Sequence, residues 1–314
     1  MATCGLPCLL CDRLVFNDLD QQELLFDRRR VYSILESTGV PVPKYVIFDA
    51  DHSATTSIVE EDDCVTISGV KLRKPLVEKP VSGEDHNICI YYPRSQGGGS
   101  KRLFRKVGDC SAQYYPNENR LRLHDGGSYI YEELLQTEGT DVKVYAVGTE
   151  YAHAEARKSP IVDGRVLRNA RGKEMRYPVI LSAEEKEVAR KVVLGFGQTM
   201  CGFDILRSNG KSFVCDVNGW ASVKDSTKFW DDASNLLRAY CLSALAPSHF
   251  SSSPRVHPPR QPESPRSSNA VDAEPELQAE LAEGIHGPHH STPRPLRHQR
   301  QLWACNVLTP VLCL

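Results

Sequence analysis

The chain has 314 residues, of which 40% are hydrophobic and 25% charged, and its formal net charge is -2. This size allows one sizeable hydrophobic core or two smaller ones, and no apolar run approaches the length that would cross a bilayer. The eleven cysteines are scattered, and three of them, Cys89, Cys201 and Cys215, lie in apolar runs. We therefore expect free thiols in a cytosolic protein, rather than a small disulfide-stabilised domain.

Helix-like and strand-like segments alternate between residues 27 and 245. Apolar residues at helical spacing predict a helix over 27–38, which Gly39 ends, and a second, amphipathic helix over 183–199. Runs of β-branched and aromatic residues predict strands at 44–48, 88–92, 103–107, 128–132, 141–147 and 152–156. Two such runs flank Asn209-Gly210, which predicts a tight hairpin. Together, these elements indicate an α+β fold with mixed or antiparallel sheets.

The predicted hairpin contains a candidate metal site. Asp204 lies on its first strand, while Asp216 and Asn218 lie two residues apart on its second. Residues two apart on a strand share a face, and pairing around the turn can bring Asp204 to the same side. Two carboxylates and an amide oxygen suit Mg²⁺, which takes its other ligands from water and nucleotide phosphates. The alternative is an ordinary hairpin with polar residues on its solvent face.

Three other segments have features of a nucleotide site. Lys79 ends an apolar run just before a proline, where it can hold a phosphate from a rigid element; the alternative is a solvated lysine. The glycines 97–99 precede four cations, and backbone amides in such a loop can surround phosphates, although the spacing of a P-loop is absent. The alternative there is a flexible connection. The strand that enters a loop at 131–135 can pair with a purine edge, with Asp141 and Lys143 as ribose and phosphate contacts.

Many cations are spread over the predicted strands and the loops between them. If they converge on one cavity, they indicate a polyanionic ligand, because like charges repel unless they are compensated. Otherwise they are ordinary surface cations. Nucleic acid fits less well, because aromatic residues do not alternate with the basic ones as they do in a stacking surface. The set comprises Arg105, Lys106, Lys143, Arg157, Lys158, Arg168, Arg176 and Lys224.

Several long segments across 27–247 resemble one enzyme family. Among them are KPLVEKPVSGEDHNICIYYP, GGGSKRLFRK, GTDVKVYAVG and CGFDILRSNGKSFVCDVNG, which resemble the kinase domain of the diphosphoinositol-pentakisphosphate kinases. The resemblance implies an ATP-grasp fold, in which two lobes with mostly antiparallel sheets hold ATP and Mg²⁺. It also implies transfer of the ATP γ-phosphoryl group to a phosphate of inositol hexakisphosphate or 5-diphosphoinositol pentakisphosphate, which gives a 1-position diphosphate.

The same resemblance implies roles for individual residues. The nucleotide contacts would be Arg28, Lys79, His86, Arg105, Glu132, Glu133, Leu134, Leu135, Asp141, Val142, Lys143, Ser159, Asp204, Asp216, Val217 and Asn218. Asp204, Asp216 and Asn218 would be the Mg²⁺ ligands. The substrate contacts would be Arg105, Lys106, Lys143, Arg157, Ala221, Ser222, Val223 and Lys224. Catalysis would depend on Lys79, Arg105, Lys143 and Asp216, through positioning and charge neutralisation rather than a general base.

The resemblance also divides the chain into expected parts. Residues 1–26 would be a remnant or an alternative leader, 27–135 the first lobe, 136–247 the second lobe, and 248–314 a disordered tail rich in Pro, Ser, His and Arg. The domain that precedes these lobes in the family is expected to be largely missing, and Ala221 stands where the family has Ser. Two competing hypotheses remain: a truncated, non-catalytic binder of ATP or inositol phosphate, and an ATP-grasp carboxylate–amine ligase, which the substrate cations disfavour.

Overall fold

The computed structural model describes residues 14–122 and 126–245. Residues 16–237 form one compact unit, and the two ends of the chain are grouped into a second. The elements that bear on function lie in the first unit. The tail for which we predict disorder lies outside the described residues, and the predicted boundaries of the two lobes stay a prediction. None of the described helices has the length and hydrophobicity needed to cross a membrane.

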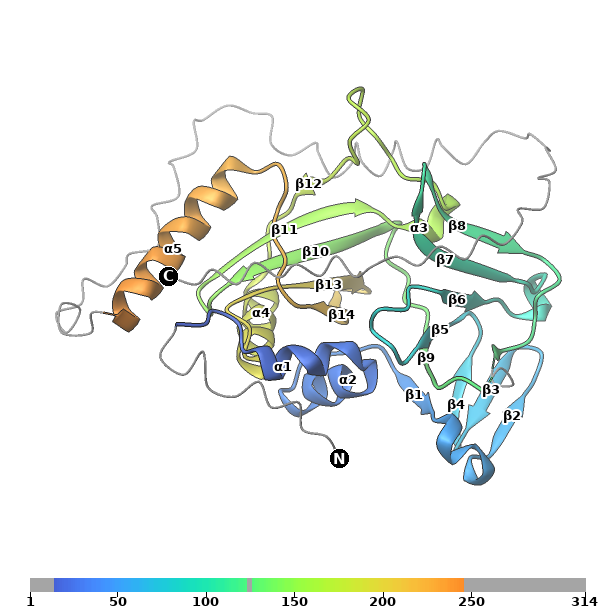
Figure 1. Ribbon diagram of the computed structural model, residues 1–314. Helices are drawn as coiled ribbons and strands as arrows, with labels where there is room; N and C mark the ends of the chain where they lie inside the picture. The colour runs from blue at the N-terminus through green and yellow to red at the C-terminus, as the bar shows by residue number, and fades with distance from the viewer. Residues whose placement is uncertain (1–13, 123–125, 246–314) are drawn as a thin grey trace, which may run out of the picture. The chain divides into compact units, whose positions relative to one another are not determined.

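The first sheet has six antiparallel strands in the order β1-β9-β5-β6-β7-β8 (Figure 1). They are β1 (Tyr45–Phe48), β5 (Leu76–Pro80), β6 (Ile88–Tyr91), β7 (Ser100–Val107), β8 (Cys110–Tyr115) and β9 (Tyr129–Glu133). A small sheet consists of β2 (Ile58–Glu60), β3 (Cys64–Ile67) and β4 (Val70–Arg73). Its buried side chains form one hydrophobic cluster with those of the first sheet. The sequence analysis missed this small sheet, because runs of three or four residues carry little periodicity.

The second sheet has five antiparallel strands in the order β12-β11-β10-β13-β14. They are β10 (Thr140–Val147), β11 (Tyr151–Lys158), β12 (Tyr177–Pro178), β13 (Met200–Ser208) and β14 (Lys211–Asn218). Asn209 and Gly210 connect β13 to β14, and both have positive φ angles, of 51° and 71°. A type I′ turn requires this conformation at both central residues. The predicted hairpin and the α+β class with antiparallel sheets are therefore confirmed.

The helices start and end at clear local signals. They are α1 (Leu19–Glu23), α2 (Arg28–Ser37), α3 (Pro160–Asp163), α4 (Ala183–Phe196) and α5 (Thr227–Leu245), with three 3-10 turns at Leu24–Phe26, Ala50–Thr55 and Arg94–Gln96. Ser182 and Glu185 form a reciprocal capping box at the start of α4. The helix ends before the predicted residue 199, because Gly197 adopts the left-handed conformation typical of a helix C-terminus.

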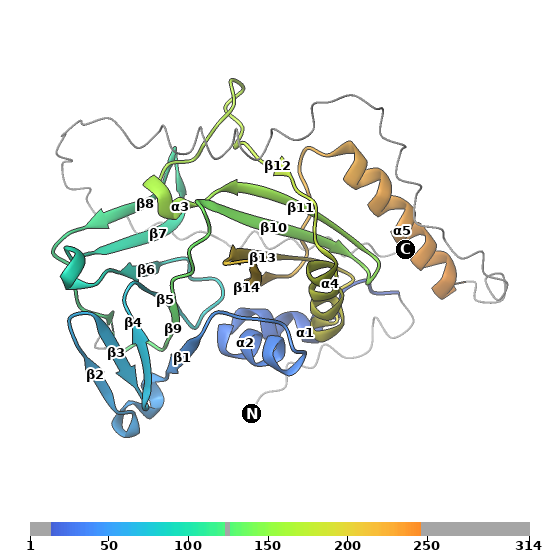
Figure 2. The ribbon, with the colours of Figure 1, turned by 180° about the vertical axis from the view of Figure 1, so that it is seen from behind.

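One face of the second sheet is apolar and forms most of the core. Val142 and Val144 of β10 lie in one buried cluster with Phe203 of β13 and with Val192 and Phe196 of α4. Both views show α2 and α4 side by side next to this sheet (Figures 1 and 2). Because side chains alternate along a strand, burying this face turns the intervening residues of every strand to the opposite face.

Candidate nucleotide and phosphate site

The face of the second sheet that points away from the core is lined with ionisable residues. Strand register places Glu155, Lys143, Asp204 and Asp216 side by side across β11, β10, β13 and β14. Asn218, two residues beyond Asp216, lies opposite Gly202 in the next row. The sheet therefore brings the three predicted metal ligands to one face, together with Lys143.

A β-bulge is what aligns the two aspartates. Between Ile205 and Asp204 the register shifts by one residue, so that Asp204 pairs with Asp216 and Cys215 is left without a partner in the ladder. An unbroken two-residue hairpin would pair Asp204 with Cys215 and turn Asp216 to the other face. The extra residue places both carboxylates on the polar face, as bulges near functional sites commonly do.

The contacts of Asp204 fit a bound cation. Its Oδ2 accepts a hydrogen bond from Lys143 Nζ at 2.9 Å, and Arg157 lies 3.8 Å from Oδ1. Oδ1 is buried, and among the described residues it has no hydrogen-bond partner. Burial alone would raise the pKa of Asp204, but Lys143 and Arg157 outweigh it and lower the pKa. The carboxylate is therefore ionised and has an unused acceptor oxygen, as a hard cation requires.

Asp216 and Asn218 would have to complete such a site. Asn218 Nδ2 donates to Asp216 Oδ2 at 3.2 Å, which orders the two side chains relative to each other. Within 14–122 and 126–245, no group of three or more His, Cys, Asp or Glu side chains is arranged to hold a metal. Two carboxylates and one amide fit Mg²⁺ that keeps water and phosphate ligands, and they do not fit an ion that needs an all-protein cage.

Lys79 is enclosed by partners from both sheets. Its ammonium lies 2.5 Å from Glu132 Oε1 on β9, and it donates to Tyr32 Oη at 3.1 Å and to the Cys215 carbonyl at 3.0 Å. The unpaired bulge residue thus supplies an acceptor to a lysine of the other sheet. Burial alone would lower the pKa of Lys79, but Glu132 and Asp216 are among the groups that raise it, so the amine is charged. Tyr32 also donates to Glu132 Oε2.

Arg28 and His86 lie around the loop that follows β5. The Arg28 guanidinium is buried and donates to the carbonyl oxygens of Pro80 at 2.7 Å, Ser82 at 2.5 Å and Asp85 at 3.1 Å. His86 is exposed, with Nδ1 at 2.7 Å from the Glu84 carbonyl and 3.4 Å from Arg105 Nε. The structure therefore shows Arg28 holding this loop, and its predicted contact with a nucleotide stays a prediction, as do those of His86 and Arg105.

The glycine loop before β7 is held by internal hydrogen bonds. The amides of residues 97, 98 and 99 donate to the Arg94 carbonyl, the Pro93 carbonyl and Asn119 Oδ1, respectively. All three glycines have positive φ angles, of 99°, 67° and 83°. This stretch is thus a connection between β6 and β7, but an internally hydrogen-bonded one rather than the flexible one named as the alternative, and its amides are engaged within the protein.

The predicted adenine linker continues β9 into the loop before β10. The amide of Glu133 donates to the Lys44 carbonyl at 2.9 Å, and that of Leu134 donates to the Pro75 carbonyl at 3.3 Å. Leu135 follows them and is half-buried, whereas Val142 and Val217 are both buried in the core. The backbone amides of 133 and 134 are therefore engaged in this structure, and recognition of adenine by this linker stays a prediction.

Asp141 lies near the start of β10, opposite Arg157 on β11. Its Oδ1 is buried and has no hydrogen-bond partner among the described residues. Burial raises the pKa of this carboxyl to about 6, Asp204 adds to the rise, and Arg157 and Ser159 oppose it. Ser159 is buried at the start of α3. An orphaned carboxylate oxygen suits a ligand hydroxyl as donor, which agrees with the predicted ribose contact.

The predicted substrate residues are divided between two regions. Lys106 and Arg157 lie near Arg176, and Glu174 pairs with Lys106 and Arg176. In the other region, the segment after β14 crosses β13 at Gly202, where an added Cβ would lie 2.6 Å from that of Ala221. Ser222 is half-buried, Val223 is buried and Lys224 is exposed.

Three residues of the candidate site were missed by the sequence analysis. Tyr32 has the spacing of a core residue on α2, and nothing in the sequence marks its hydroxyl. Glu174 follows a glycine turn that has no hydrophobic period. Glu155 alternates with Ala154 and Ala156 on β11, so its placement on the polar face was accessible from the period of two.

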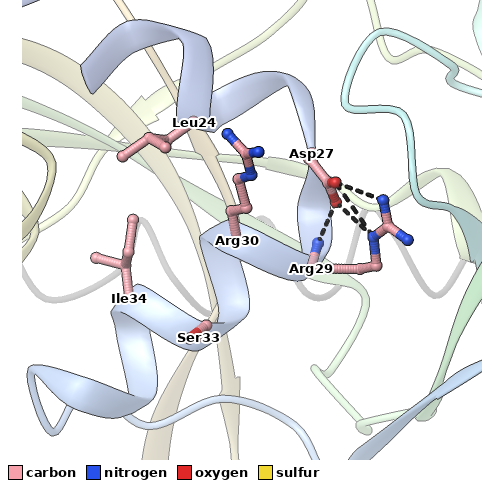
Figure 3. A pocket seen from close by; sticks show the side chains of 6 residues that line it. All are labelled: Leu24, Asp27, Arg29, Arg30, Ser33 and Ile34. Carbon is pink, nitrogen blue, oxygen red and sulfur yellow. Dashed lines mark hydrogen bonds and ion pairs between the residues drawn. The ribbon is translucent and has the colours of Figure 1, made fainter. Parts of the chain in front are cut away.

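A surface pocket lies apart from these residues, along α2. Figure 3 shows Arg29 turned toward Asp27, whereas Arg30 points the other way, beside Leu24. None of the predicted site residues lines it, so it does not add to the nucleotide site. It is lined by Leu24, Asp27, Arg29, Arg30, Ser33 and Ile34.

This geometry defines an antiparallel α+β protein in which one face of the second sheet carries a row of ionisable residues. The chain is 57% identical over 238 residues to the inositol hexakisphosphate and diphosphoinositol-pentakisphosphate kinase VIP1 of Arabidopsis thaliana, across 75% of this chain and 22% of that protein. It is 55% identical over 235 residues to the human inositol hexakisphosphate and diphosphoinositol-pentakisphosphate kinase 2, across 74% of this chain and 19% of that protein. The chain is therefore a relative of the inositol hexakisphosphate and diphosphoinositol-pentakisphosphate kinases, as its motifs predict, and it spans about a fifth of their length.

Family models and solved structures were also compared with the chain. No protein-family model matches the chain. The ATP-grasp ligase PsnB, complexed with a phosphomimetic variant of its minimal precursor, Mg and ADP, resembles it with a TM-score of 0.43 and 17% identity, over 71% of this chain and 61% of that one. Because the TM-score is below 0.5, no property of that ligase is transferred to the chain.

Proposed function

We propose that this chain is an ATP-dependent kinase module that transfers the γ-phosphoryl group of ATP to a phosphate of inositol hexakisphosphate or 5-diphosphoinositol pentakisphosphate. The observation that carries the proposal is the row of Lys143, Asp204 and Asp216 on one face of the second sheet. It places a cation beside two carboxylates, which suits a metal–nucleotide complex next to an anionic acceptor. Kinship to kinases of this name supports the acceptor.

In this proposal, Asp204, Asp216 and Asn218 hold Mg²⁺, which would neutralise charge on the transferring phosphates. Lys79 is held in place by Glu132, Tyr32 and the bulge carbonyl, so its ammonium is preorganised for a nucleotide phosphate. Lys143 contacts Asp204 at 2.9 Å and can neutralise charge between donor and acceptor. No residue has to act as a general base, because acceptor phosphate oxygens are already ionised near neutral pH.

Buried free thiols support a reducing compartment for the protein. Cys64, Cys89 and Cys201 are buried and unbridged. Burial raises the pKa of Cys201 to about 12, so its thiol is neutral and unreactive. We propose the cytosol as the location of the protein on this basis, with a soluble inositol polyphosphate as its partner rather than nucleic acid.

The deciding experiment incubates the full chain with Mg²⁺-ATP and radiolabelled inositol hexakisphosphate. We expect a more highly phosphorylated inositol, lost in Asp216→Asn and kept in Asp62→Asn, an exposed aspartate that pairs only with Arg94 among the described residues. A folded chain that binds both ligands but makes no product would favour the non-catalytic alternative. ADP release that requires a carboxylate and an amine would favour a ligase.

A further inference from the structure

Glu174 lies at the centre of three cations at the end of the polar face. Its carboxylate forms an ion pair with Lys106 and accepts from Arg176 Nε at 3.2 Å and Nη2 at 2.9 Å. Arg157 is near enough to interact electrostatically with Glu174, with Lys106 and with Arg176. Two of these cations, Lys106 and Arg157, belong to the predicted substrate contacts. The carboxylate that pairs with Lys106 and Arg176 is therefore a side chain of the protein, whereas Arg157 pairs with Asp204 at 3.8 Å.

The segment that holds Glu174 is a short hairpin between α3 and β12. The Met175 amide donates to the Leu167 carbonyl at 2.8 Å, and Asn169 Oδ1 accepts from the amides of Arg171 and Lys173, each at 3.0 Å. Figure 1 shows the connection from α3 to β12 projecting beyond the second sheet. Glu174 is thus presented from a turn that has its own internal hydrogen bonds and lies outside the strands of both sheets.

The hairpin is also joined to the first sheet. Arg168 Nε donates to Asp109 Oδ1 at 2.5 Å, in the turn between β7 and β8, and the Val166 amide donates to the Asp109 carbonyl at 2.9 Å. Lys106 lies on β7, just before this turn. Glu174 and Lys106 are therefore brought together from two different elements, and the ion pair connects the hairpin to β7.

The geometry points to Glu174 as a displaceable counter-ion of Lys106 and Arg176, which gives up these two cations to a phosphate of a ligand that binds at this subsite. This inference rests on the proposed function, because it names where one phosphate of the inositol acceptor binds. An Arg fork with a neighbouring ammonium is arranged as it would be for a phosphate oxygen pair. A phosphate monoester carries about -1.5 to -2 charge near neutral pH, so it can replace a carboxylate of charge -1.

Displacement of Glu174 requires free energy, which makes the binding free energy less favourable for every ligand that uses this subsite. A ligand that binds elsewhere, such as ATP at Lys79, does not bear that cost. The counter-ion also compensates Lys106 and Arg176, which would otherwise repel each other before the acceptor binds. Glu174 therefore lowers the affinity for the acceptor while it leaves the affinity for the nucleotide unchanged, and acceptor binding releases the hairpin 167–175.

The test is Glu174→Gln in the full chain, with dissociation constants for inositol hexakisphosphate and for ATP measured separately by calorimetry at one salt concentration. The Kd for inositol hexakisphosphate is expected to fall by about three- to tenfold, with that for ATP unchanged. The matched control is Glu187→Gln on α4, where an exposed carboxylate pairs with Arg190. This control should leave both constants unchanged.

An unchanged or weaker affinity for the acceptor in Glu174→Gln would overturn the inference, because Glu174 would then only support the cations. If that variant fails to fold, hydrogen exchange on the wild-type chain decides: inositol hexakisphosphate should raise exchange at the amides of 167–175, and stronger protection there would overturn the inference. Absence of any binding of inositol hexakisphosphate to both proteins would overturn the proposed function as well, whereas binding to wild type alone would overturn only the counter-ion role.

Discussion

Glu132 is the residue whose role the structure changes most. The resemblance places it in the adenine linker and implies a nucleotide contact, but Glu132 lies within β9, and its buried carboxylate pairs with Lys79 and Tyr32. Water cannot compensate a buried ammonium, so Lys79 depends on this carboxylate for its charge. Glu132 therefore fixes the position of the Lys79 ammonium, and its own contact with a nucleotide stays a prediction.

We expect Glu132→Ala to lower the free energy of unfolding by about 3–5 kcal/mol, because it leaves a charged lysine buried without its main partner. Urea unfolding measures this loss. The neighbouring Glu133→Ala is the matched control, since that side chain is only half-buried and accepts from the Lys44 amide. Equal losses in the two variants would show that the Lys79 pair contributes little.

Asp141 should make stability depend on pH. Its folded pKa of about 6 exceeds that of the unfolded chain, 3.8. The folded state therefore holds its proton more tightly, and stability falls as the pH rises from about 4 to 6, by up to about 3 kcal/mol. Asp141→Asn should remove this part of the pH dependence. Urea midpoints at several pH values measure it, and identical slopes for wild type and variant would contradict the assignment.

At the scale of elements, the β13–β14 hairpin and the segment after it organise the site. Gly202 has no side chain at the point where Ala221 crosses β13, and a Cβ there would lie 2.6 Å from that of Ala221. Such a separation is impossible without movement of one of the two segments. The position of 221–224, and with it that of the predicted substrate contact Lys224, therefore depends on a glycine in the middle of a strand.

Gly202→Ala should displace the 221–224 segment and weaken binding of inositol hexakisphosphate by about tenfold, an effect of about 1.4 kcal/mol, with little change in the affinity for ATP. Calorimetry with each ligand measures both. The double variant Gly202→Ala/Ala221→Gly removes the clash and should restore much of the lost affinity. Loss of affinity for both ligands in the single variant, without recovery in the double one, would point to a disrupted sheet instead.

For the whole molecule, the second sheet separates an apolar face from a charged one. Lys143, Arg157 and Arg176 lie on or beside the charged face with Asp204, Glu155 and Glu174, so most of its charges are already paired. A net charge of -2 therefore conceals a local cluster of paired cations and carboxylates. Its attraction for a polyanion depends on local geometry and on salt rather than on the overall balance.

Raising ionic strength from about 0.05 to 0.3 M should weaken binding of inositol hexakisphosphate steeply, because the Debye length shrinks below the spacing of partly exposed charges. A titration series at several salt concentrations measures the slope. Arg176→Gln should make the slope shallower than in wild type, whereas Arg190→Gln on the exposed surface of α4 should not change it. An equal slope in all three proteins would exclude the cluster as the binding region.

The sequence by itself determined the elements and the chemistry available to them. Alternation along β10, β11 and β13 predicts one apolar and one polar face, and Asn209-Gly210 predicts the hairpin, because both signals are local. Spacing alone also marked Asp204, Asp216 and Asn218 as a possible set. The long motifs pointed to the kinase family to which the chain proved to be related.

Only the tertiary structure decided how these residues meet. The bulge at Cys215 places Asp204 opposite Asp216, and the carbonyl that it leaves unpaired accepts from Lys79 of the other sheet. The burial of Glu132 and the pairing of Glu174 with Lys106 likewise join residues far apart in the chain. Such contacts depend on where β-ladders shift and which charges must be compensated on burial, and neither is encoded in the local period of the sequence.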